Sequence, residues 1–301
     1  MALDPAALRF LEAVRDIPQP YEMALAEFRR AGEDLVRTSE PEPITKVDEF
    51  IIPGGDGQEL RLRCYVPAHE GPRPVVVWLH GGSFIRGSLD MFDAIRRSFA
   101  NGTGCIVLAV DQRLSPEAQF PAPLEDAYAA IRWAADNADS LGGDPNRLGV
   151  GGESSGGNLA TAVTLLARKR GAPRLAFQVL VTPLVDATVG SVSAREYGEG
   201  YVLTRQQLIW AYEQYAPGVS RVDPLLSPLH EPRLDGLPPA VVLTVEYDPV
   251  RDEGELYARR LAAEGVPVSS ARIDGFLHHF PGSQAVPTLV RLTCGLLELL
   301  E

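Results

Sequence analysis

One serine in the chain carries the pattern of a nucleophile. Residues 152–156 read GESSG, which fits the G-x-S-x-G motif of a nucleophile elbow with Ser154 at its centre. The motif follows a short apolar strand at 148–150 and leads directly into a helical pattern of apolar residues. It matches neither a P-loop nor a dinucleotide fingerprint, which leaves a tight turn with a capping serine as the alternative. We therefore predict that Ser154 is the nucleophile of a covalent mechanism.

A nucleophilic serine also needs hydrogen-bond donors for the negative charge that develops on the substrate oxygen. Residues 80–84 read HGGSF and follow an apolar strand, and consecutive glycines let backbone amides turn toward one point. A plain glycine turn is the alternative. The predicted donors of this oxyanion hole are the backbone amides of Gly81, Gly82, Ser83 and Ser155.

The acid that orients the base is expected just beyond a strand that follows the serine along the chain. Asp248 comes directly after the apolar strand at 240–245 and before a proline, at the start of the next helix. Asp186, at the end of the preceding strand, is the strongest alternative. Asp252 and Glu246 are weaker, because one lies on the predicted helix and the other still in the strand. Asp248 could also serve only as a helix cap.

The base is expected after the last strand, where the sequence reads DGFLHHF. It offers two adjacent candidates, His278 and His279, and spacing alone does not choose between neighbours in a loop. His80 precedes the serine within the donor loop and is expected to be structural. His69 and His230 are isolated loop residues that we expect to be solvated.

These residues need a scaffold that brings the ends of several strands together. From residue 74 onward apolar strands without polar alternation are separated by helices, which predicts an α/β fold with a mostly parallel sheet covered on both faces. An earlier hairpin gives the sheet an antiparallel start. The predicted strands are 45–52, 60–66, 75–79, 105–110, 148–151, 176–181, 240–245 and 268–273. The predicted helices of this part are 91–100, 124–135, the one after 154, 251–263 and 286–300.

Two regions interrupt this alternation and are expected to form a helical cap. The first holds predicted helices at 5–16 and 21–38, and the second lies between 186 and 239 with one clear helix at 205–215. The predicted division of the chain is a cap segment at 1–43, the first part of the core at 44–186, a cap insertion at 187–225 and the second part of the core at 226–301.

Composition excludes several classes of function. The 301 residues carry a formal net charge of -12, which disfavours nucleic acid and anionic membranes as partners. No window is apolar enough to span a bilayer, and the first residues do not resemble a signal peptide, so we expect a cytoplasmic protein. Cys64, Cys105 and Cys294 are far apart and show no metal-ligand spacing, so we expect reduced thiols and no metal or organic cofactor.

The ordered motifs together resemble those of the hormone-sensitive lipase family of bacterial α/β-hydrolase esterases. The resemblance runs from about residue 74 to 280. Its segments are HGG at 80–82, DQRLSPE at 111–117, the elbow with GNLA at 157–160, EGY at 199–201, YDP at 247–249, RDE at 251–253 and GFLHHF at 275–280.

The resemblance implies an α/β-hydrolase fold and a serine carboxylesterase that cleaves short- to medium-chain acyl esters of small molecules. It implies Ser154 as nucleophile, Asp248 as acid and His278 as base, because the family's histidine lies three places after a glycine and two before a phenylalanine. It also suggests a homodimer through the edge of the sheet. Alternatives with the same fold are an amidase, lactonase or carbamate hydrolase, or a ligand-binding protein without catalysis.

Several positions depart from the family's usual residues. Ser83 replaces a third glycine, Gln112 a tyrosine, Glu153 an aspartate, Ser155 an alanine and His279 a glycine. Ser83 and Ser155 still carry backbone amides, so an oxyanion hole remains possible with altered side chains around it. Aromatic residues of the cap are expected either to line an acyl pocket or to pack the cap onto the core. They are Phe10, Tyr21, Phe28, Tyr197, Tyr201 and Trp210.

Overall fold

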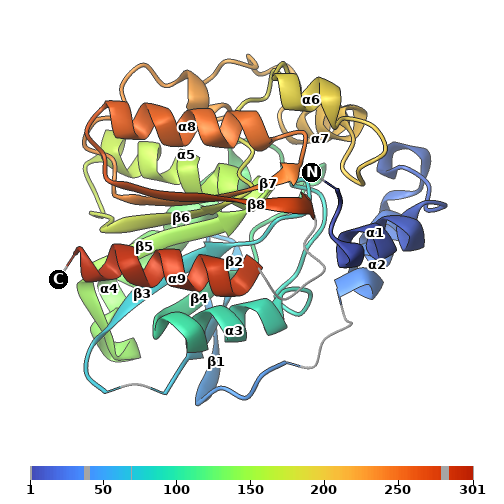
Figure 1. Ribbon diagram of the computed structural model, residues 1–301. Helices are drawn as coiled ribbons and strands as arrows, with labels where there is room; N and C mark the ends of the chain where they lie inside the picture. The colour runs from blue at the N-terminus through green and yellow to red at the C-terminus, as the bar shows by residue number, and fades with distance from the viewer. Residues whose placement is uncertain (1, 37–40, 69, 279–284, 301) are drawn as a thin grey trace.

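The centre of the molecule is a mixed, mostly parallel β-sheet (Figure 1). The computed structural model describes residues 2–36, 41–68, 70–278 and 285–300. Within them the sheet has the strand order β1-β2-β4-β3-β5-β6-β7-β8, in which β2 is antiparallel to β1 and β4 and the other pairs are parallel. The predicted α/β fold with an antiparallel start is confirmed. The strands are β1 Lys46–Pro53, β2 Glu59–Val66, β3 Arg73–Leu79, β4 Ile106–Val110, β5 Gly143–Glu153, β6 Phe177–Val181, β7 Ala240–Tyr247 and β8 Val268–Leu277.

Helices cover both faces of the sheet, because the central strands are apolar on both sides. In Figure 1, α5 and α8 lie above the sheet and α3 and α9 below it. The helices of these layers are α3 Asp93–Thr103, α4 Ala122–Asn137, α5 Ser155–Arg170, α8 Arg251–Ala263 and α9 Ala285–Glu298. Short 3-10 turns occur at η2 Asp139–Leu141 and η3 Pro228–His230. None of the described helices is long and apolar enough to cross a membrane.

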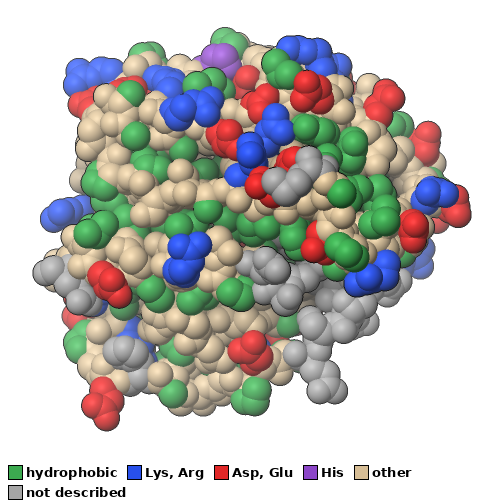
Figure 2. Space-filling view, in the orientation of Figure 1, with side chains coloured by type: hydrophobic (Ala, Val, Ile, Leu, Met, Phe, Trp, Pro, Cys, Tyr) green, Lys and Arg blue, Asp and Glu red, His purple; other side chains and the backbone are tan. Residues whose placement is uncertain are grey.

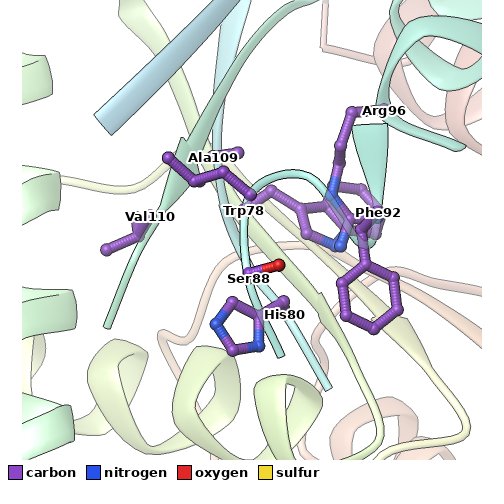
Figure 3. A pocket seen from close by; sticks show the side chains of 8 residues that line it. Trp78, His80, Ser88, Phe92, Arg96, Ala109 and Val110 are labelled. Carbon is purple, nitrogen blue, oxygen red and sulfur yellow. The ribbon is translucent and has the colours of Figure 1, made fainter. Parts of the chain in front are cut away.

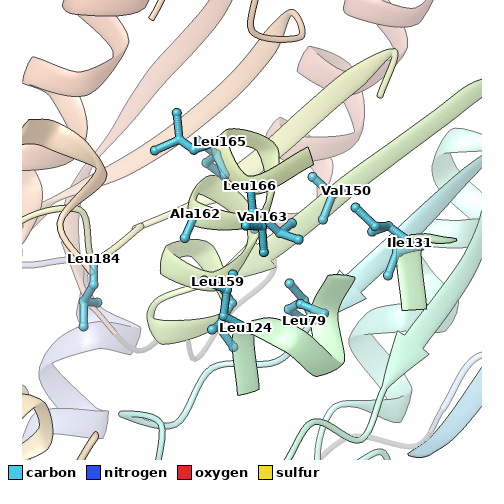
Figure 4. Packing of buried hydrophobic residues seen from close by; sticks show 14 of the residues in the cluster. Leu79, Leu124, Ile131, Val150, Leu159, Ala162, Val163, Leu165, Leu166 and Leu184 are labelled. Carbon is cyan, nitrogen blue, oxygen red and sulfur yellow. The ribbon is translucent and has the colours of Figure 1, made fainter. Parts of the chain in front are cut away.

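The larger core cluster joins α4 and α5 to one face of the sheet. Figure 4 shows Leu79 and Val150 of the strands together with Leu124 of α4 and Leu159 of α5. All four side chains are at most 2% exposed. Replacing any one of these buried leucines by alanine is expected to destabilise the fold by about 2–5 kcal/mol. This packing fixes the helix that follows Ser154 against the sheet.

The sheet register brings the carboxyl ends of several strands to one edge. Leu79 of β3 pairs with Gly152 of β5, and Tyr247 of β7 pairs with Leu277 of β8. The loops that follow these strands therefore start close together. In open α/β sheets, ligands bind at the carboxyl ends of the parallel strands.

The two interrupting regions lie together on one side of the molecule (Figure 1). Their elements are α1 Pro5–Val14, η1 Pro20–Glu22, α2 Leu25–Val36, α6 Val192–Glu196 and α7 Arg205–Tyr215. Phe28 of α2 packs edge-to-face on Trp210 of α7, with ring centroids 5.9 Å apart. Tyr197 and Tyr201 pack against Tyr247 of the core. These four cap aromatics thus join the cap to itself and to the core.

The cap also differs from the sequence-based prediction in two places. The helix expected at 21–38 is instead a 3-10 turn followed by α2, because the backbone at Met23 is extended (φ -124°, ψ 163°). Residues 37–40 lie outside the described residues. The short helix α6 was not predicted; Ser191 caps it by accepting a hydrogen bond from Ala194 N. The division of the chain into cap and core segments stays a prediction.

Candidate active site

Ser154 lies on a sharp turn between β5 and α5. Its backbone angles are φ 55° and ψ -120°, a conformation that L-residues rarely adopt. A Cβ on Gly152 would collide with the carbonyl of Gly156, and a Cβ on Gly156 would collide with that of Leu79. Both glycines of the motif are therefore required by close backbone approach. The turn holds Ser154 at the carboxyl edge of the sheet.

Three predicted residues meet in a continuous chain of hydrogen bonds. The Ser154 Oγ lies 2.9 Å from His278 Nε2, and His278 Nδ1 lies 2.8 Å from Asp248 Oδ2. Asp248 is fully buried and His278 is 4% exposed. Because an ionised carboxylate only accepts hydrogen bonds, Asp248 favours the tautomer with the proton on Nδ1. Nε2 then carries the lone pair that can accept the proton of Ser154.

The alternative acids have other partners. Asp186 Oδ1 lies 3.0 Å from His230 Nε2, so His230 is also paired rather than only solvated. Asp252 accepts a hydrogen bond from Ser193 N at 2.8 Å, and Glu246 accepts one from Gly275 N at 2.8 Å. His279 and His69 lie outside the described residues.

His80 is expected from the sequence to be structural, and its contacts are consistent with that role. Its Nδ1 lies 2.8 Å from the carbonyl oxygen of Gly81, and its ring stacks on Phe92. Burial lowers the pKa of His80, which keeps the imidazole neutral. Figure 3 shows His80 beside Ser88. Both residues line a small cavity of about 10 Å³, near the least volume that holds one water molecule.

The loop after β3 has an unusual backbone conformation. Gly82, Ser83 and Phe84 all have positive φ, of 123°, 60° and 64°. The N–H of Gly81 donates to Glu153 Oε1 at 2.9 Å, so this amide is engaged. The expected donors therefore narrow to Gly82, Ser83 and Ser155.

The Glu153 side chain anchors this loop to the core by hydrogen bonds, a role that the sequence did not predict. Its carboxylate accepts hydrogen bonds from Arg96 Nη2 at 2.7 Å and from Trp78 Nε1 at 2.5 Å, besides the one from Gly81. Arg96 is only 2% exposed, and its guanidinium lies over the Trp78 ring. The residue just before the nucleophile thus holds the loop opposite it. Only the departure of Glu153 from aspartate marked this position in the sequence.

In the described part of the chain, no three side chains of His, Cys, Asp or Glu come together as a metal site. All three cysteines are free thiols. Burial raises the pKa of Cys64 and of Cys105 to about 12, so both remain protonated at neutral pH.

Comparison with known proteins extends over nearly the whole chain. The family model described as the α/β hydrolase fold matches residues 76–282. An arylesterase of Saccharolobus solfataricus is 37% identical over 99% of this chain and 98% of its own length. An ethyl acetate hydrolase of Pseudomonas putida is 37% identical over 93% of this chain and 92% of its own. A hyperthermophilic esterase of Pyrobaculum calidifontis, a solved structure, has a TM-score of 0.93 and 37% identity, with 99% of each chain covered.

Proposed function

The chain belongs to the α/β-hydrolase family and is a serine carboxylic ester hydrolase, and we propose that Ser154, His278 and Asp248 form its catalytic triad. The observation that carries this proposal is the hydrogen-bond chain from Ser154 Oγ through the imidazole to Asp248. Nucleophile, base and orienting acid follow one another within hydrogen-bonding distance, as acyl transfer through a serine requires.

In the proposed mechanism His278 Nε2 takes the proton of Ser154 as its Oγ attacks the ester carbonyl. The amides of Gly82, Ser83 and Ser155 donate to the tetrahedral oxyanion; one such donor is typically worth about 10²–10³ in turnover. His278 then protonates the leaving alcohol. Water activated by the same nitrogen attacks the acyl-enzyme. The bond between the acyl carbon and Ser154 Oγ then breaks, His278 returns the proton to Oγ, and the carboxylic acid leaves. Asp248 holds the imidazole in place and offsets its positive charge.

We propose esters of short- to medium-chain acids as substrates. The relative named ethyl acetate hydrolase supports a short acyl group, and the relative named arylesterase supports an aromatic alcohol. A panel of nitrophenyl esters from acetate through butyrate and octanoate to laurate tests this, with a nitroanilide and a lactone beside them. The proposal predicts the highest kcat/KM on acetate, butyrate or octanoate. Faster turnover of laurate, the anilide or the lactone would overturn it.

A homodimer and a cytoplasmic location are further proposals. In Figure 2, hydrophobic side chains gather in a band between α8 and α9, where β8 forms the edge of the sheet. An open edge strand with apolar surroundings favours pairing with a second copy. Sedimentation of the purified chain at several concentrations measures the association directly.

A further inference from the structure

Ser83 occupies a strained position in the oxyanion loop. Its φ of 60° lies in the left-handed region, where glycine fits without strain and a side chain does not. Ser83 is nevertheless 8% exposed, with its side chain turned into the protein. A strained non-glycine residue at a functional site indicates that its side chain has a use.

The Ser83 hydroxyl accepts a hydrogen bond from the cap. Its partner is Gln207 Nε2 of α7 at 3.3 Å, and Gln207 is 5% exposed. Gln207 lies in the first turn of α7, where its backbone N–H donates to the capping hydroxyl of Thr204 at 3.0 Å. The same Thr204 hydroxyl donates to Gln19 Oε1 at 3.2 Å. A polar chain thus runs from the N-terminal cap segment through α7 to the oxyanion loop.

Apolar contacts hold the next two loop residues against the same helix. The ring of Phe84 stacks on that of Tyr215, with centroids 3.9 Å apart and an interplanar angle of 6°. Ile85 is fully buried in a cluster with Ala211. Gln207, Ala211 and Tyr215 are four residues apart and share one face of α7. This face therefore packs on loop residues 83–85.

The other end of the loop is held by the core. The Gly81 N–H donates to Glu153, which directly precedes the nucleophile. The two loop amides that remain as donors, Gly82 and Ser83, lie between this anchor and the cap anchor at Gln207. Their direction toward the substrate oxygen depends on both ends.

We propose that Gln207 is a positioning residue that aligns the oxyanion donors through the Ser83 hydroxyl, and so makes catalysis depend on the contact between α7 and the loop. This inference rests on the proposed function, in which the amides of Gly82 and Ser83 stabilise the oxyanion. Gln207 touches no reacting atom; it acts through the Ser83 hydroxyl. Removing the side-chain amide of Gln207 should therefore lower kcat while changing KM much less.

The test compares two variants that break one contact from opposite sides. Gln207→Met keeps an unbranched side chain without the amide, and Ser83→Gly removes the hydroxyl and relieves the strained φ. Gln206→Met is the matched control, because Gln206 is the neighbouring, exposed glutamine of the same helix. On nitrophenyl acetate we expect kcat of Gln207→Met and of Ser83→Gly to fall about tenfold, with KM changed less than about twofold. This loss is smaller than the roughly 10²–10³ of a deleted donor, because the backbone amides remain and are only misaligned. The control should match the unaltered protein.

The double variant decides whether the two residues act through one contact. If they do, Ser83→Gly combined with Gln207→Met loses no more than the worse single variant. Additive losses, an effect on KM alone, or an unchanged kcat in both single variants would each overturn the inference. Ser154→Ala, run in parallel, separates this from a failure of the proposed function, because retained activity in that variant would remove the triad itself. Thermal unfolding of each variant identifies one that is not folded, and the other single variant then decides.

Discussion

The carboxylate of Glu153 accepts the backbone N–H of Gly81 at 2.9 Å, which joins the nucleophile turn to the loop opposite it. The same carboxylate neutralises Arg96, whose side chain is 2% exposed. One side chain thus fixes the distance between the serine and its oxyanion donors and also satisfies a buried cation.

Glu153→Gln should lower the free energy of unfolding and should also lower kcat for ester hydrolysis. Glutamine keeps an acceptor for Gly81 but leaves the buried Arg96 guanidinium without a counter-charge, and removing one partner of a buried pair costs roughly 3 kcal/mol. Urea unfolding measures the loss. The matched control combines Glu153→Gln with Arg96→Met, which removes both charges. It should recover part of the lost stability, and a further loss of similar size would contradict the proposed pairing.

Asp248→Asn should lower kcat steeply, by up to about ten-thousandfold on the precedent of other triads. Asparagine can present a donor to His278 Nδ1, which favours the wrong tautomer. Asp186→Asn is the control, since Asp186 pairs with His230 instead. Steady-state kinetics on one nitrophenyl ester compares them. If Asp186→Asn lost activity and Asp248→Asn did not, the acid would be misassigned.

Glu253→Gln should change the pH dependence of stability. Burial raises the pKa of Glu253 well above its usual value, against the hydrogen bonds it accepts from the amides of Val185 and Asp186. The folded state therefore binds the carboxyl proton of Glu253 more tightly than the unfolded state does. The stabilisation that comes from this protonation is full at low pH and is lost as the pH rises through the pKa of the folded state. Glutamine keeps an acceptor and never ionises.

The stability difference between Glu253→Gln and the unaltered protein should therefore grow in favour of glutamine with rising pH. Urea unfolding of both proteins at about pH 5 and about pH 8 measures it. An equal difference at the two pH values would show that Glu253 does not carry a raised pKa.

The fold was predictable because its signals are local. Apolar strands without alternation, such as Val75 to Leu79, indicate a parallel sheet whatever they pack against. Ser154 and Asp248 were likewise marked by their positions directly after strands. Choosing His278 over its neighbour needed the family resemblance, since spacing in a loop does not show which side chain turns inward.

The supporting contacts could not be predicted from the sequence. Arg96 lies 57 positions from Glu153, and Gln207 lies 124 positions from Ser83. Nothing in either segment alone specifies such a partner, because the contact exists only once helices α3 and α7 are placed against the sheet. The Gly81 amide was expected as a donor to substrate for the same reason, since its acceptor Glu153 belongs to another strand.

The most direct test of the central claim is covalent labelling of Ser154 by a serine-directed phosphonate. The unaltered protein should take up about one label per chain and lose its esterase activity in parallel, since the label occupies the nucleophile of the acyl-enzyme mechanism. Ser155→Ala, which keeps its backbone amide, should still be labelled. Ser154→Ala should take up none and show no burst with nitrophenyl acetate. Stoichiometric labelling or a retained burst in Ser154→Ala would contradict the assignment of the nucleophile.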